Sequence, residues 1–140
     1  MFNIYFQALL NRLLEKYNEH LPILLEKDIP FTAAASERVD VTLDSVDYDV
    51  ILVGISVNFS NSNVLARVSD TAKQYFWSQN FCPITSLAGV STQVSPVLAL
   101  PAPYLLDRQS RVQVEFVNSA SSPSASTSKI VFHGIRVRNV

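Results

Sequence analysis

The spacing of apolar residues changes once along this chain, and that change limits the folds open to it. Near the N-terminus, apolar side chains recur at steps of three and four, as they do on one face of an α-helix. These residues are Phe2, Phe6, Leu9, Leu10, Leu13, Leu14 and Tyr17. From about Val39 onward the apolar period is two, the period of β-strands. The sequence therefore predicts an amphipathic helix over residues 3–18, followed by a mainly β domain.

The β part contains six to eight short strands separated by turn residues, which is typical of a sandwich or a barrel. The clearest stretches are residues 39–43, 50–59, 64–68, 111–118 and 129–137, with a weaker one at 73–78. The stretch 50–59 is apolar on both faces, so we expect it at the centre of a sheet. In the last stretch the alternation breaks at His133-Gly134, where a β-bulge would restore it.

Four prolines limit which strands can form in the middle of the chain. Pro83, Pro96, Pro101 and Pro103 exclude a regular central strand at those points and favour edge strands or extended loops. The spacing does not separate a jelly roll from an immunoglobulin-like sandwich, but the proline-rich central stretch favours a jelly-roll-like β-sandwich. The serine-rich residues 119–128 have little apolar surface to bury and predict a loop.

We expect one hydrophobic core from 140 residues. The predicted organisation is an N-terminal helix and connector over 1–36 and a β-sandwich over 37–140. Pro22 limits the helix, because the residue before a proline avoids helical geometry. Residues 23–25 either open a short second turn or pack as extended chain.

Charge and composition narrow the classes of partner. The 11 basic and 12 acidic residues give a net charge of −1, so we expect no nucleic-acid partner. No basic leader and no run of about 18 apolar residues is present, so we expect no targeting signal and no membrane partner. The single Cys82 excludes an internal disulfide.

Residues with catalytic chemistry are few. Cys82 and His133 are residue types that can form a nucleophile–base dyad. A buried thiol and a strand histidine satisfied by hydrogen bonds are the simpler interpretation. Asp44, Asp47 and Asp49, with Asp40 nearby, are oxygen ligands of the kind that hold calcium, yet their spacing does not match an EF-hand. A solvated acidic turn is the simpler interpretation. We therefore expect no enzymatic activity, no catalytic residues, no cofactor and no resident metal.

Two features favour binding. Trp77, beside Tyr75 and Phe76, is a candidate for stacking on a sugar, although such a residue more often belongs to a core or an interface. The second feature is the apolar face of the predicted helix, which we call the helix stripe. Three interpretations of it stay open: it packs on its own β-domain, it docks on a neighbouring subunit, or it lies on a membrane surface. Aromatic residues are favoured at interfaces, and the candidate partner-binding residues are Phe2, Phe6, Leu9, Leu13 and Tyr17.

The C-terminal part of the chain shows a pattern of prolines, polar turn, strand ending in asparagine, loop, and strand with glycine. The residues are Pro101-Ala-Pro103-Tyr-Leu-Leu-Asp107-Arg-Gln-Ser110, Val112-Gln-Val-Glu-Phe-Val-Asn118 and Ile130-Val-Phe-His-Gly134-Ile-Arg-Val. This pattern resembles small accessory virion proteins of tailed bacteriophages, over about residues 50–138 and without the N-terminal helix.

The resemblance implies a non-enzymatic virion structural protein on a β-sandwich, similar to capsid decoration or cement proteins or to neck and tail components. It implies a homo-oligomer that contacts capsid, portal/neck or tail subunits, located in the virion and, during assembly, in the host bacterial cytoplasm. The alternative expectation is a carbohydrate- or receptor-binding β-sandwich module of a phage tail.

Overall fold

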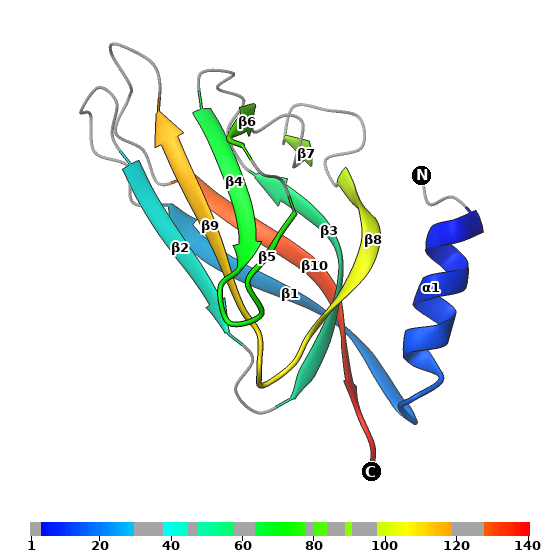
Figure 1. The fold of residues 1–140 in the computed structure, drawn as a ribbon. Coiled ribbons are helices and arrows are strands. Elements are labelled where there is room, and N and C mark those ends of the chain that lie inside the picture. Colours follow the sequence, from blue (N-terminus) through cyan, green and yellow to red (C-terminus); the bar gives the residue numbers. More distant parts are fainter. Residues whose placement is uncertain are drawn as a thin grey trace.

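The computed structural model describes residues 4–29, 38–44, 48–57, 64–77, 80–83, 89–90, 98–118 and 128–140. Within these residues the chain forms one helix and two β-sheets (Figure 1). The elements in chain order are α1 (Ile4–Leu14), β1 (Glu19–Ile29), β2 (Arg38–Asp44), β3 (Asp49–Val57), β4 (Val64–Asp70), β5 (Tyr75–Phe76), β6 (Cys82–Pro83), β7 (Gly89–Val90), β8 (Leu98–Leu106), β9 (Arg111–Asn118) and β10 (Ser128–Arg138). The expected mainly β fold with an N-terminal helix is confirmed.

The strands pair in a nested pattern. In one sheet β1 pairs with β10, β10 pairs with β3, and β3 pairs with β8, all antiparallel; β7 adds a short parallel pair beside β3. In the other sheet β2 pairs with β9, β9 with β4, and β4 with the short β5 and β6, all antiparallel. The first strand therefore pairs with the last, the second with the last but one, and the third with β8.

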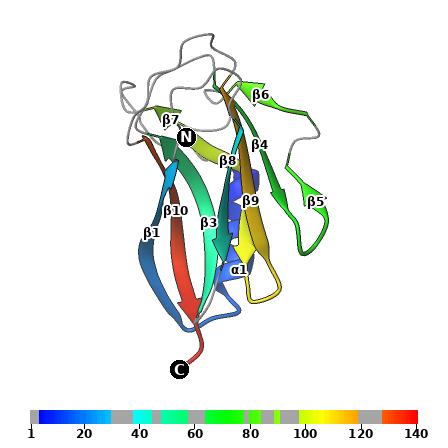
Figure 2. The ribbon, with the colours of Figure 1, turned by 90° about the vertical axis from the view of Figure 1, so that its left-hand side faces the viewer.

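The two sheets pack face to face around one apolar core, as the views along the sandwich show (Figure 2). Each sheet contributes alternate side chains that are almost fully enclosed, because strand residues point in turn to the core and away from it. The most enclosed large side chains include Ile51, Ile55 and Phe132 from one sheet and Leu43 and Phe116 from the other. β3, which was expected at the centre of a sheet, lies between β10 and β8.

β1 is the main difference from the expected organisation. Residues 19–29, assigned to the helix-and-connector segment 1–36, pair with β10 along their whole length, so the sheet includes part of that segment. Of the two alternatives for residues 23–25, the extended one is observed. A proline fits here because β1 pairs on one side only within the described chain, and an edge strand tolerates a residue without an N–H group.

Two predictions from residue patterns are confirmed in the strands. The pairing of β10 with β3 shifts register between His133 and Gly134, where the β-bulge was expected. A Cβ atom at Gly134 would lie 2.7 Å from Val50 Cγ1 and 2.9 Å from the carbonyl oxygen of Ile51, so only glycine fits. β8, which carries Pro101 and Pro103, pairs only with β3 within the described chain and is an edge strand.

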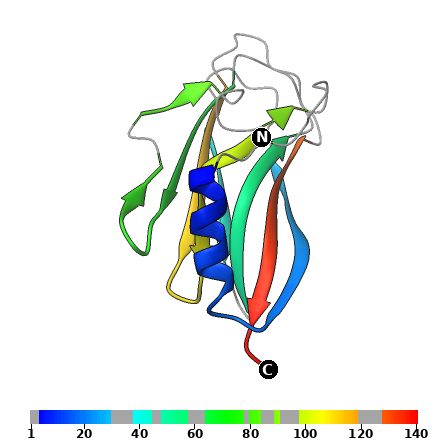
Figure 3. The ribbon, with the colours of Figure 1, turned by 90° about the vertical axis from the view of Figure 1, so that its right-hand side faces the viewer.

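α1 is shorter than the expected helix over 3–18 and ends at Leu14. The backbone N–H of Tyr17 donates to the carbonyl of Leu14 at 3.1 Å, which tightens the last turn. His20 Nε2 lies 2.9 Å from the carbonyl oxygen of Leu14 and 2.8 Å from that of Tyr17, so the imidazole contacts the carbonyl groups at the end of the helical segment. Figure 3 shows α1 lying lengthwise along the side of the sandwich beside β8.

Candidate functional site

The apolar stripe of α1 faces the protein's own sheets. Phe6 is 1% exposed and Leu10 is 7% exposed, and both belong to the core that holds residues of both sheets. Leu9, Leu13 and Tyr17 are half-buried, while Phe2 lies outside the described residues. The expectation that Phe6 binds a partner is corrected, because α1 packs on β8 and encloses this side chain. Partner binding through the half-buried residues stays a prediction.

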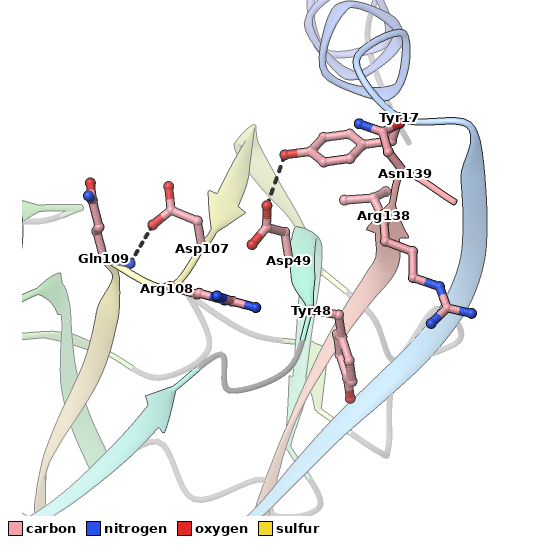
Figure 4. Close-up of a pocket in the computed structure, with 9 residues that line it drawn as sticks. Tyr17, Tyr48, Asp49, Asp107, Arg108, Gln109, Arg138 and Asn139 are labelled. Carbon is pink, nitrogen blue, oxygen red and sulfur yellow. Dashed lines mark hydrogen bonds between the residues drawn. The ribbon is translucent and has the colours of Figure 1, made fainter.

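A hydrogen bond from Tyr17 links the end of the helical segment to β3. Its hydroxyl donates a hydrogen bond of 3.1 Å to Oδ2 of Asp49 at the start of β3 (Figure 4). Burial, this hydrogen bond and the negative charges of Asp49 and Asp107 raise the pKa of Tyr17. The bond lies in a polar hollow of about 530 Å³ lined by Tyr17, Tyr48, Asp49, Asp107, Arg108, Gln109, Val137, Arg138 and Asn139.

The face of α1 turned away from the sheets carries exposed apolar side chains. Ile4 is 90% exposed and Tyr5 is 73% exposed. Both lie outside the stripe that the periodicity identified, so the sequence pattern gave no reason to select them. They are the large apolar side chains of α1 that a neighbouring molecule can reach.

A second hollow, of about 530 Å³, lies between the β4–β5 turn and β8. Its lining, which we call the aromatic hollow, consists of Lys73, Tyr75, Trp77, Leu100, Ala102, Pro103, Tyr104 and Leu105. Trp77, the sugar-stacking candidate from the sequence, is therefore brought together with a tyrosine from the opposite sheet. Tyr104 lies 27 residues further along the chain, and nothing in the spacing of the sequence pairs it with Trp77.

Three aromatic rings form a continuous surface in this hollow. The rings of Tyr75 and Tyr104 are stacked, with centroids 6.1 Å apart and an angle of 3° between their planes. The ring of Trp77 is tilted by 58° against Tyr104, with centroids 5.2 Å apart. Tyr75 is 53% exposed, so this aromatic surface is open to solvent.

Asp70 holds Tyr104 in place from the end of β4. Its side chain is fully enclosed and accepts hydrogen bonds from the Tyr104 hydroxyl and from the backbone N–H groups of Ala72, Lys73 and Arg111. Burial alone raises the pKa of Asp70, but the hydrogen bonds from Tyr104 and the backbone outweigh it and lower the pKa. Burial and the hydrogen bond to the Asp70 carboxylate raise the pKa of Tyr104.

The turn that presents Tyr75 has an unusual backbone. Gln74 has a φ of 54°, in the left-handed region that residues other than glycine seldom adopt. Such conformations persist where surrounding contacts enforce them, and they concentrate at functional sites. The backbone N–H of Trp77 donates to the carbonyl of Val68 at 3.0 Å, which fixes the far end of the same turn.

Lys73 is the charged residue among those that line the aromatic hollow. The Lys73 ammonium lies 5.7 Å from the centroid of the Tyr104 ring and 3.4 Å from Oδ2 of Asp107. The indole N–H of Trp77 is buried and has no acceptor among the described residues. The hollow thus combines an aromatic surface with one ammonium group.

Comparison with known proteins identifies no family. No family model matches the chain, and no curated protein matches it. Among solved structures, the Drosophila NLP core, described for its pentamer formation and histone binding, is 11% identical, covers 87% of this chain and 100% of its own, and has a TM-score of 0.38. The VP2 subviral particle of infectious bursal disease virus is 11% identical at a TM-score of 0.38 and covers 86% of this chain. This chain spans 33% of that VP2 chain.

The Cys82–His133 pair considered from the sequence is not brought together by a hydrogen bond. Cys82 lies in β6, where its thiol donates to the carbonyl of Ala66 at 3.6 Å. His133 lies in β10 of the other sheet, and its Nε2 is 2.9 Å from the hydroxyl of Ser56. Burial lowers the pKa of His133, which favours the neutral imidazole at pH 7.

The acidic cluster considered for calcium is described only in part. Asp47 and the side chain of Asp44 lie outside the described residues, while Asp49 accepts the hydrogen bond from Tyr17. Among the described residues, no group of three or more histidine, cysteine, aspartate or glutamate side chains is placed to hold a metal ion. Within the same residues, no helix has the length and apolarity to cross a membrane.

Proposed function

We propose that this chain is a non-enzymatic structural protein of a tailed-bacteriophage virion, and that its two sheets form a jelly roll. The observation that carries the proposal is the nested antiparallel pairing of β1 with β10, β2 with β9, β3 with β8 and β4 with β5. A jelly roll is a folded hairpin of this kind, and it recurs in viral capsid domains. It also recurs in lectins, so the fold alone does not fix the function.

The resemblance to accessory virion proteins supports the same role. The three segments that carry it, 101–110, 112–118 and 130–137, fall on β8 with the turn after it, on β9 and on β10. We propose that the chain forms a homo-oligomer and contacts capsid, portal/neck or tail subunits, after assembly in the host bacterial cytoplasm.

The exposed apolar side chains indicate where such contacts would form. Ile4 and Tyr5 project from α1, and Leu24, 63% exposed, projects from the edge strand β1. Burying such side chains against a neighbour removes apolar surface from water and stabilises an assembly. The proposed contact surface is therefore the outward side of α1, in place of the enclosed Phe6.

Purified particles of the virus that encodes the chain test this proposal. We expect mass spectrometry to find the chain in the particles at constant stoichiometry, and electron cryomicroscopy to locate it against capsid, neck or tail subunits. Ile4→Asp should reduce its incorporation while the melting temperature stays unchanged. Thr42→Asp, an exposed position on β2 away from α1, is the matched control. A monomeric chain that is absent from particles would overturn the proposal.

A carbohydrate- or receptor-binding module is the second candidate. The specific observation in its favour is the aromatic hollow around Trp77, Tyr75 and Tyr104. Lectins share the jelly-roll fold, so this candidate differs from the first in its ligand and not in its architecture. As a module of a phage tail it would also be present in virions, so specific glycan binding by a chain located on the tail would favour it over the first.

A further inference from the structure

We propose that the aromatic hollow is a binding site for an acidic saccharide, a pyranose unit that carries a carboxylate. The sugar ring lies against the aromatic surface of Tyr75 and Trp77, and the carboxylate lies near the ammonium group of Lys73. This assignment concerns the chemistry of one site and does not depend on a role in the virion.

The aromatic surface provides the stacking contact. A pyranose has one face of C–H groups that packs against an aromatic ring, while its hydroxyls stay at the edges and need polar partners. The hollow offers two tyrosine rings and an indole from two sheets, and Tyr75 is 53% exposed. Its volume of about 530 Å³ lies within the range of small-molecule sites.

The charge of the lining determines the class of saccharide. Lys73 is the charged residue among those that line the hollow. Its ammonium has three donors, and the 3.4 Å contact with Asp107 uses one of them. The side chains of this pair are 36% and 28% exposed, so solvent screens the contact and a ligand can share the ammonium. A carboxylate accepts charge-assisted hydrogen bonds from an ammonium group, so a carboxylate on the ligand can share Lys73 with Asp107.

The indole of Trp77 contributes its ring to the hollow rather than its N–H group. The N–H is buried and without an acceptor among the described residues, so a ligand in the open hollow contacts the ring. Trp77 therefore contributes stacking area, and Lys73 provides the polar contact.

The site is held in its shape before any ligand arrives. The Asp70 carboxylate fixes the Tyr104 hydroxyl, and the left-handed backbone at Gln74 sets the position of Tyr75. A preformed site loses less conformational entropy on binding, so more of the contact energy appears as affinity. The left-handed conformation at Gln74 places the Tyr75 ring parallel to the Tyr104 ring.

Trp77 is the single tryptophan of the chain, so its fluorescence reports directly on the hollow. We expect trigalacturonate to change the emission in a saturable way. The matching neutral galactose trisaccharide should bind at least about tenfold more weakly. The absence of a saturable change with trigalacturonate, or equal binding of the two trisaccharides, would overturn the proposal.

Variants separate specific binding from general attraction between charges. Lys73→Gln should weaken trigalacturonate binding at least about tenfold and leave binding of the neutral trisaccharide unchanged. Lys16→Gln, which removes an exposed lysine outside the hollow, is the matched control and should bind as the unmodified chain does. Equal losses in both variants would overturn the proposal.

Trp77→Phe keeps an aromatic ring but removes the N–H donor, and calorimetry follows its binding without the fluorophore. We expect weaker binding of both trisaccharides, and the melting temperature verifies that the variant is folded where binding is measured. Proline-rich peptides also dock in aromatic-lined grooves. A proline-rich peptide that changes the Trp77 emission when trigalacturonate does not would overturn the saccharide in favour of a peptide. Neither result bears on incorporation into virions, so this proposal and the virion role fail independently.

Discussion

The hydroxyl of Tyr104 in β8 donates a hydrogen bond to Oδ2 of Asp70 at the end of β4, and this bond joins the two sheets. The same carboxylate also accepts hydrogen bonds from the backbone N–H groups of Lys73, in the turn after β4, and of Arg111, at the start of β9. One buried side chain thus ties together β4, the turn after it, β8 and β9. Hydrogen bonds to a buried charged group are among the stronger ones in proteins.

Tyr104→Phe should destabilise the fold, because the Asp70 carboxylate stays buried and loses one of its donors. We expect a loss of about 1–3 kcal/mol in the free energy of unfolding, measured by urea denaturation. Tyr5→Phe removes a hydroxyl from a ring that is 73% exposed and is the matched control. If the two variants unfold at the same urea concentration, the bond to Asp70 contributes nothing measurable.

Stability should fall in acid partly through Asp70. Its pKa is lower in the folded chain than in the unfolded chain, so its contribution is fully present above the unfolded value of about 3.9 and is lost as the pH falls through the folded value. The difference in unfolding free energy between the unmodified chain and Asp70→Asn should therefore be largest at neutral pH and shrink below about pH 4. Urea denaturation at both pH values measures it. A difference that grows in acid would contradict this assignment.

Phe6→Ala should destabilise the whole fold, because the ring is 1% exposed within the shared core. Truncating an enclosed phenylalanine typically costs about 3–5 kcal/mol. The adjacent Tyr5→Ala alters an exposed ring on the same helix and should change stability by about 0.5 kcal/mol or less. Thermal and urea unfolding of both variants make the comparison. If Phe6→Ala melts like Tyr5→Ala, α1 is not part of the core.

Gly134→Ala should be destabilising at the bulge of β10. The new methyl group would meet Val50 Cγ1 at 2.7 Å and the Ile51 carbonyl oxygen at 2.9 Å, and the backbone atom cannot move aside easily. Overpacking of this kind costs about 1–3 kcal/mol. Val131→Ala, at a half-buried position of the same strand, removes atoms without creating a close contact and serves as the control. A Gly134→Ala variant as stable as the unmodified chain would show that the strand can shift to make room.

Local patterns in the sequence predicted local structure well. The apolar period identified α1 and β3, and the interrupted alternation at His133-Gly134 identified the bulge, because both signals involve neighbouring residues. β1 was not predicted as a strand. Its alternation is broken twice: Lys27 stands between Leu25 and Ile29, where an apolar residue would continue the pattern, and the apolar Leu24 is exposed.

The contacts that build the candidate site join residues far apart in the sequence. Asp70 and Tyr104 are 34 residues apart and lie in different sheets, so no spacing rule pairs them. The sequence identified Trp77 as a binding candidate from its chemistry, but its neighbours in the hollow depend on how the sheets pack. Which side of α1 stays exposed likewise depends on where β8 lies. The apolar periodicity of the helix gives no information about that position.

The pairing of β1 with β10 has a consequence for how the protein is made. Arg138 and Glu19, which form an ion pair across these strands, are 119 residues apart. Within the described chain β1 pairs with β10 alone, so β1 has no neighbour in the sheet until residues 128–138 have left the ribosome. Contacts of such high sequence separation slow folding, because the chain must close a long loop before they form. β1 therefore stays unpaired while residues 30–127 are synthesised, and unpaired strand edges of this kind are prone to aggregation.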